Sequence, residues 1–172
     1  EISSEDLDEM EQVACPSAGA CGAQFTANTM ATVSEAIGLA LPYSAGAPAP
    51  YEIRDRFSMA AGQMIMDLIA KNIRPRDICT RKAFENAAVV IAASGGSTNG
   101  GLHLPAMARA SGVLLDLADF DEISQSVPLM AKVYPNGMAD VNAFHAAGGL
   151  GLLMRELMDA GLLHADAKTV MG

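Results

Sequence analysis

An uncharged apolar segment that leads directly into a glycine-rich loop constrains the fold more than any other feature. Residues 87–94 read AAVVIAAS, and residues 95–101 read GGSTNGG. A short buried segment, a glycine-rich turn and a following helix (102–111) form the order typical of a strand in a parallel sheet. Periodicity alone leaves a buried helix open at 87–94. We therefore expect an α/β fold, a layered and mainly parallel sheet flanked by helices, as part of a larger domain.

Apolar spacing and capping residues predict the remaining elements. The same spacing predicts two further extended segments, 113–117 and 128–137. Proline and glycine clusters between the elements predict turns, above all in LPYSAGAPAPYE (41–52). The predicted helices cover residues 3–13, 25–39, 52–72, 80–86, 119–127, 139–147 and 150–160.

Composition narrows the class of protein. Of the 172 residues, 51% are hydrophobic and 18% are charged, which is enough for one domain with a sizeable core. The net charge of −9 argues against nucleic acid as a partner, because phosphates require basic patches. The apolar runs are too short and too interrupted to span a membrane. We expect a cytoplasmic protein, since three cysteines are too few for a disulfide framework.

The two ends of the sequence suggest a piece of a longer polypeptide. The first residues, EISSEDLDEM, are acidic and do not resemble a signal peptide. No initiator methionine is present, and the last residues, KTVMG, read as an extended run without a closing element. We therefore expect residues 1–172 to form a single α/β segment of a larger domain.

Cys21 lies in a glycine-rich turn, between Gly19 and Gly22, just before a predicted helix. Such a turn lets a metal ion or a substrate approach the backbone closely, and a helix N-terminus favours the thiolate. On spacing alone, Cys21 could be a metal ligand, a nucleophile, half of a disulfide or an apolar core residue. Cys15 and Cys21 are separated by five residues and do not form a zinc knuckle.

The glycine loop carries Ser97, Thr98 and Asn99 between the expected strand and helix. Hydroxyls, an amide and backbone N–H groups in such a turn suit a carboxylate or a phosphate. The loop has no lysine of a nucleotide P-loop and does not match the dinucleotide fingerprint. A tight turn capped by Ser and Thr is the alternative interpretation of the same residues.

Several motifs, in this order and spacing, resemble the dihydroxy-acid dehydratase and 6-phosphogluconate dehydratase family. The resemblance covers nearly the whole chain, so it is far more specific than a single glycine loop. The motifs are GACGAQFTANTM (19–30), EAIGLALPYS (35–44), IRPRDICTRKAFENA (73–87), GGSTN (95–99) with LHLPAMA (102–108), and GLLHADAKTV (161–170).

The resemblance implies a role for Cys21 as one of three cysteine ligands of an iron–sulfur cluster, [2Fe–2S] or [4Fe–4S]. The resemblance further implies that such a cluster would supply Lewis acidity toward the C3 hydroxyl of a 2,3-dihydroxy carboxylate, whose dehydration yields a 2-keto acid. The family also implies Mg²⁺ in some members and a homo-oligomer. Its other two cluster cysteines and its serine base have no counterpart in this sequence, so the catalytic base is expected outside it. We expect the isolated chain to be inactive.

Two alternatives to a dihydroxy-acid dehydratase remain at this point. The segment VPLMAKVYPNGMADVNAFHAAGG (127–149) is more similar to 6-phosphogluconate dehydratase than the first half of the chain is. The other alternative is a non-catalytic α/β module that binds a small carboxylate through Ser97, Thr98 and Asn99.

Overall fold

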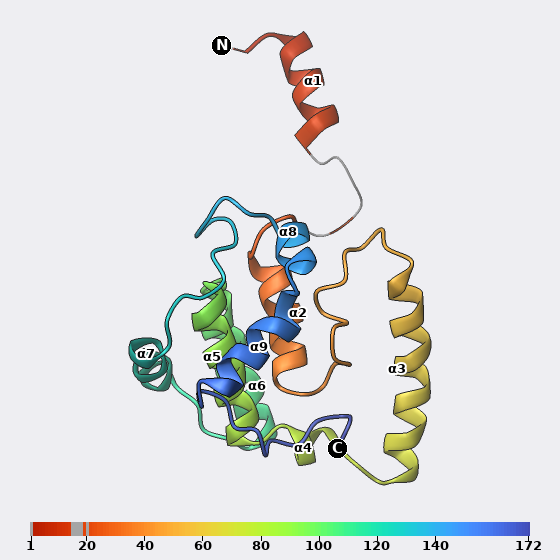
Figure 1. Ribbon diagram of the computed structural model, residues 1–172, viewed down its shortest axis with the longest axis vertical. Coiled ribbons are helices and arrows are strands. Elements are labelled where there is room, and N and C mark those ends of the chain that lie inside the picture. Colours follow the sequence, from red (N-terminus) through yellow and green to blue (C-terminus); the bar gives the residue numbers. More distant parts are fainter. Residues whose placement is uncertain (1, 15–18, 20) are drawn as a thin grey trace.

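A computed structural model describes residues 2–14, 19 and 21–172, and the described chain is built from helices. Figure 1 shows α2, α5, α6 and α9 gathered in one body, with α3 at its side. No helix in these ranges is long and apolar enough to cross a membrane. The helices are α1 (Ser4–Ala14), α2 (Thr26–Ala36), α3 (Ile53–Ala70), α4 (Pro75–Ile78), α5 (Arg81–Ser94), α6 (Asn99–Ser111), α7 (Leu117–Ser126), α8 (Val141–Ala146) and α9 (Gly149–Asp159).

The expected parallel sheet is wrong, because residues 87–94 form the second half of helix α5 rather than a strand. Thr80 caps the helix by accepting the N–H of Ala83, and nothing in the sequence interrupts the helix after Asn86. Gly95, at φ 60°, ends it in the left-handed conformation. The buried-helix alternative for this segment is therefore confirmed.

The two other expected strands also find no strand partner within the described residues. The N–H groups of Met130 and Ala131 both donate to the carbonyl of Ala93 at the end of α5, at 2.8 and 3.0 Å. Because those N–H groups are taken by a helix end, residues 128–137 form no β-ladder. The described chain contains one isolated bridge, between Val133 and Ala139.

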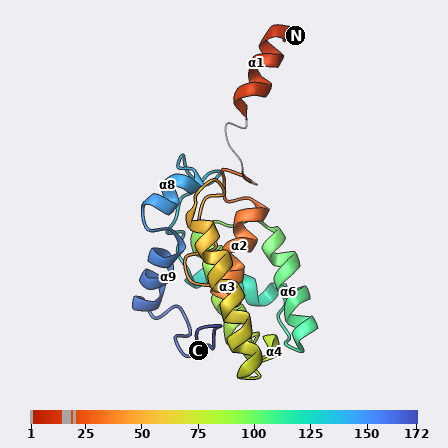
Figure 2. The same cartoon turned by 90° about the vertical axis from the view of Figure 1, so that its right-hand side faces the viewer.

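Helix α5 lies at the centre of the hydrophobic core and contacts α2, α6, α7 and α9. Phe84 is fully buried, and small alanines on several sides of α5 let the neighbouring helices approach closely. Predicted helices at the positions of α1, α2, α3, α6, α7, α8 and α9 are confirmed within a few residues. Helix α3 has no buried residue and stands in front of α2 when the molecule is turned by 90° (Figure 2).

Candidate functional site

Three segments that are far apart in the sequence meet at the N-terminal end of α2. The turn at 21–24 precedes the helix, the glycine loop at 95–99 follows α5, and the third segment runs from 133 to 142. Backbone hydrogen bonds join the first segment to the third, from Gln24 N–H to Tyr134 O and from Val141 N–H to Gly22 O, each at 2.9 Å. The structure therefore brings both predicted site loops to one helix end.

The turn that carries Cys21 is held by a side chain from the helix after it. Asn28 donates its side-chain amide to two carbonyls of the turn, those of Cys21 at 2.9 Å and Ala23 at 2.6 Å. The Cys21 thiol is half-buried and forms no disulfide with a cysteine in the described part of the chain. Its Sγ accepts the Ala23 N–H at 3.3 Å, and the thiol donates to the Ala23 carbonyl at the same distance.

Cys21 faces a cavity of about 350 Å³. The first turns of α2 form one wall, residues 45–50 form the second and the start of α8 forms the third. Arg54, from the first turn of α3, also lines this cavity and donates to the Ala47 carbonyl at 2.8 Å. The cavity is large enough for a small inorganic group or a small carboxylate beside the sulfur.

The glycine loop is fastened to the same helix end through hydroxyl groups. Thr29 accepts the Ser97 N–H at 2.9 Å, and the hydroxyls of Ser97 and Thr26 lie 3.2 Å apart. Asn99 donates its side-chain amide to the Thr26 hydroxyl at 2.7 Å. Thr98 and Asn99 remain exposed, so the loop presents polar groups to solvent. None of Ser97, Thr98 and Asn99 is among the described residues that line the Cys21 cavity.

Two supporting side chains were not predicted from the sequence. Gln24, which is 2% exposed, donates to the Ser94 hydroxyl at 3.3 Å and so links the Cys21 turn to the end of α5. Asn136 donates to the Gly95 carbonyl at 2.7 Å and holds the glycine loop from the other side. The Asn-Gly pair at 136–137 could have indicated a specific turn, but not which loop it would contact.

The described residues offer a metal centre only a partial ligand set. No group of three or more His, Cys, Asp or Glu residues within the described part of the chain could hold a metal ion. Cys79 is buried beside Ser111, and burial raises the pKa of its thiol, which suits a core residue and not a ligand. Cys15 lies outside the described residues. Among the described residues, Cys21 could therefore contribute only a single ligand to a metal or cluster.

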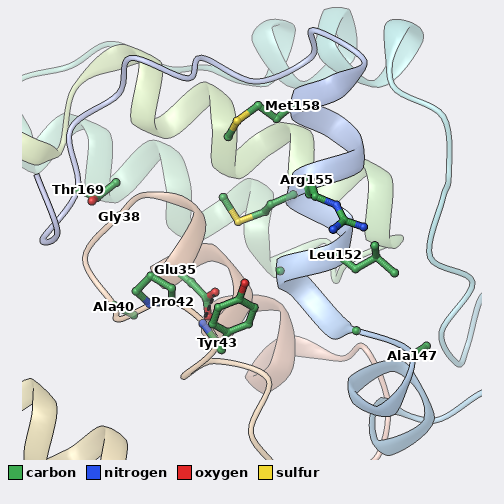
Figure 3. Close-up of a pocket in the computed structure, with 13 residues that line it drawn as sticks. Glu35, Gly38, Ala40, Pro42, Tyr43, Ala147, Leu152, Arg155, Met158 and Thr169 are labelled. Carbon is green, nitrogen blue, oxygen red and sulfur yellow. Dashed lines mark hydrogen bonds between the residues drawn. The ribbon is translucent and has the colours of Figure 1, made fainter.

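A larger cavity of about 670 Å³ lies between the end of α2 and α9. Figure 3 shows Glu35 and Tyr43 on one side of it and Arg155 of α9 on the other. Glu35 accepts the N–H groups of Tyr43 at 2.7 Å and Ala45 at 3.1 Å, and burial raises the pKa of its carboxyl. Because residues 45–47 line the Cys21 cavity, Glu35 positions one wall of that cavity.

Comparison with known proteins gives a consistent result. Residues 1–172 match a family model described as dihydroxy-acid/6-phosphogluconate dehydratase, N-terminal. The chain is 65% identical over 171 residues to dihydroxy-acid dehydratase 2 of Bradyrhizobium diazoefficiens, covering 99% of this chain and 30% of that protein. It is 61% identical over 171 residues to dihydroxy-acid dehydratase 2 of Mesorhizobium japonicum, covering 99% of this chain and 29% of the relative. The chain thus spans about 30% of the length of these curated relatives.

Proposed function

Because the chain belongs to the dihydroxy-acid/6-phosphogluconate dehydratase family, we propose that it supplies part of the active site of a hydro-lyase. The reaction removes water from a 2,3-dihydroxy carboxylate and yields a 2-keto acid. In this proposal, residues 1–172 are one segment of the N-terminal domain that binds the iron–sulfur cluster, with Cys21 as one cluster ligand. The names of the relatives favour a dihydroxy acid over 6-phosphogluconate as the substrate.

The observation that carries the proposal is the setting of Cys21. Its sulfur faces a cavity, accepts a backbone N–H group and lies on a turn held by Asn28. A bound iron–sulfur cluster, with Mg²⁺ beside it in some members of the family, would supply Lewis acidity toward the C3 hydroxyl. The role of this chain is to hold one sulfur at a fixed position and to present that sulfur to the cavity.

The glycine loop is the second contribution of this chain. Ser97 is fixed by Thr26 and Thr29, while Thr98 and Asn99 are exposed beside it. In the proposal, these hydroxyl and amide groups bind and orient the hydroxy acid. The base that removes the C2 proton is assigned to a part of the enzyme outside residues 1–172.

The cluster assignment is tested in a longer enzyme, because this chain offers a single ligand. We suggest replacing the matching stretch of the Bradyrhizobium dehydratase with residues 1–172 and loading the chimera anaerobically with iron and sulfide. Cys21→Ser should abolish the visible absorption of the cluster and the formation of 2-keto acid. Cys79→Ser is the matched control, since Cys79 is buried in the core, and it should keep both. A fully loaded and active Cys21→Ser chimera would disprove the assignment.

The loop assignment is tested in the same chimera. The double variant Ser97→Ala/Thr98→Ala should raise KM for the dihydroxy acid while the cluster absorption stays unchanged. Ser124→Ala, on the exposed face of α7, is the control. Unchanged kinetics in the double variant would show that the loop is only a structural turn.

A further inference from the structure

A buried carboxylate that the proposed reaction does not use lies near the C-terminal end of α2. Glu35 is 7% exposed and lines the larger cavity, where Figure 3 shows it beside Tyr43. Burying a carboxylate costs free energy unless the carboxylate accepts hydrogen bonds. Both oxygens of Glu35 accept one, Oε1 from the Tyr43 N–H at 2.7 Å and Oε2 from the Ala45 N–H at 3.1 Å. The carboxylate therefore binds the backbone of the turn that follows its own helix.

The turn that Glu35 binds has a strained backbone. Tyr43 has a φ of 69°, in the left-handed region, which is costly for a residue with a large side chain. Such a conformation persists where the surrounding contacts impose it. Here the bond to Glu35 fixes the Tyr43 backbone, and the Tyr43 ring lies against Gly151 of α9, where an added Cβ would overlap ring carbon Cε1. Without the carboxylate, we expect the turn to relax toward an ordinary conformation.

The strained turn leads directly into one wall of the Cys21 cavity. Residues 45–47 line this cavity, and Ala45 is the first of them. Helix α2 is attached to both sides of the cavity, because Asn28 holds the Cys21 turn and Glu35 holds the wall. A single helix that fixes both sides sets the separation between the sulfur and the wall.

We propose that Glu35 is a positioning residue that holds residues 45–47 at a fixed distance from Cys21 and so limits which molecules reach the sulfur. Glu35 acts through Tyr43 and Ala45, and it is not among the described residues that line the Cys21 cavity. The wall also sets the room for a substrate beside Cys21. This consequence for the substrate rests on the proposed function, whereas the control of access to the thiol does not.

The test measures how fast iodoacetamide alkylates Cys21 relative to Cys79 in the 172-residue chain. A Cys15→Ser background leaves these two thiols, and peptide mass spectrometry quantifies each. Glu35→Gln keeps the size of the side chain but offers one acceptor oxygen in place of two, so residues 43–47 should loosen. The ratio of the Cys21 rate to the Cys79 rate should rise about fivefold, which corresponds to one lost hydrogen bond. Cys79 is buried in the core and reports global unfolding.

The matched control is Glu156→Gln, the same chemical change in α9. The Glu156 side chain is 52% exposed and is not among the described residues that line either cavity, so its loss should leave the ratio unchanged. An unchanged ratio in Glu35→Gln, or an equal rise in both variants, overturns the proposal. Equal acceleration at Cys21 and Cys79 also overturns it, because Glu35 would then support only the fold as a whole.

Hydrogen exchange in the unchanged chain tests the proposal without a substitution. The N–H groups of Tyr43 and Ala45 lie outside the helices, yet both donate to a buried carboxylate. Both should therefore exchange at least about tenfold more slowly than the N–H of Met138, a loop residue that is 97% exposed. Equal exchange rates would show that Glu35 does not hold the turn, and they would overturn the proposal.

The consequence for the substrate is measured in the chimeric dehydratase. Glu35→Gln should lower kcat/KM about fivefold while the cluster absorption stays unchanged, whereas Cys21→Ser should remove that absorption. Unchanged kinetics in Glu35→Gln would overturn the consequence for the substrate. A failure of the Cys21 cluster assignment would leave the alkylation result intact, so failure of one proposal is distinguishable from failure of the other.

Discussion

Helices α5 and α3 are both rich in apolar residues, yet their surroundings are opposite. Nine of the residues of α5 are buried, whereas α3 has none. Met59 and Ile65 of α3 are 73% and 53% exposed, and they lie about 120° apart around the helix axis. A helix that is apolar on several sides is typical of a protein interior. Apolar composition therefore predicts that a helix packs against other elements, but not which elements these are.

The side chains of the two helices explain the difference. Alanines at 83, 87, 88 and 93 let α2, α6 and α9 approach α5, and Thr80 and Gly95 define its ends. Helix α3 has methionine and isoleucine at its exposed positions and begins without a side-chain cap. No residue of α3 belongs to the described hydrophobic core. The core of these residues is therefore organised around α5 and does not depend on α3.

The largest expected effect is the difference in stability cost between two phenylalanine-to-alanine substitutions, one in α5 and one in α3. Phe84→Ala in α5 should lower the free energy of unfolding by about 3–5 kcal/mol, because Phe84 is fully buried. Phe57→Ala in α3 should lower it by less than about 1 kcal/mol, because Phe57 is half-buried and outside the core. Urea denaturation followed by circular dichroism measures both values.

The same pair of variants in the chimeric dehydratase sharpens the comparison. If another part of the dehydratase packs against α3 there, the loss of unfolding free energy in Phe57→Ala should approach the loss in Phe84→Ala. Equal costs already in the 172-residue chain would contradict the contrast between the helices.

The charged side chains of α5 and α3 give the second contrast between these helices. Arg81 of α5 pairs with Glu85 at 2.6 Å and with Asp119 of α7 at 2.5 Å. Burial alone would raise the pKa of Glu85, but hydrogen bonds from Arg81 and His164 outweigh burial and lower it. The hydrogen bond from Arg81 is also the main cause that lowers the pKa of Asp119. Groups with lowered pKa values stabilise the folded chain above their ordinary pKa and lose that contribution as the pH falls.

The unfolding free energy should therefore decline as the pH drops below about 4.5, the ordinary pKa of a glutamate. Arg81→Gln should flatten this decline and cost at most about 1 kcal/mol at pH 7, because the Arg81 side chain is 42% exposed. Arg56→Gln on α3 should change neither quantity. An acid profile that is identical in Arg81→Gln and the unchanged chain would show that these pairs contribute nothing.

The sequence predicted the helices with amphipathic spacing well, and it failed where the spacing was uninformative. Six of the eight residues at 87–94 are buried and none is charged, so their apolar pattern is the same for a central strand and for a central helix. What decided the outcome was the continuity with the Thr80 cap, which the prediction had assigned to a separate short helix. The segment at 128–137 failed for another reason, since its N–H groups bond to Ala93, a contact that no local pattern encodes.

The candidate site was predictable in its residues but not in its assembly. Gly-rich turns indicated Cys21 and the loop at 97–99, and the structure places both at the start of α2. Their roles stay predictions until the chimera is measured. Arg54 was not predicted to line the cavity, because nothing in the sequence of its helix distinguishes it from Arg56 and it lies 33 positions after Cys21 in the chain. Long-range proximity of this kind arises from the packing of segments and not from spacing.

The smallest expected effect is a difference between two glycine-to-alanine substitutions, one in α3 and one in α6. Gly62 lies near the middle of α3, and a Cβ added there would meet no atom within 4 Å. Gly62→Ala should therefore raise the free energy of unfolding by about 0.5–1 kcal/mol, since alanine favours a helix. Gly100 of α6 is buried, and a Cβ there would lie 2.5 Å from Ile91 Cδ1 of α5.

Gly100→Ala should therefore raise the free energy of unfolding by less than Gly62→Ala does, because the Cδ1 end of the half-buried Ile91 side chain must move and its displacement offsets part of the helix gain. Urea denaturation measures both variants against the unchanged chain. If both variants gained the same stability, the contact between Gly100 and Ile91 would accept a methyl group at no more cost than the solvent-exposed side of α3. A loss for Gly62→Ala in the chimera, beside a gain in the 172-residue chain, would locate a close partner against the middle of α3.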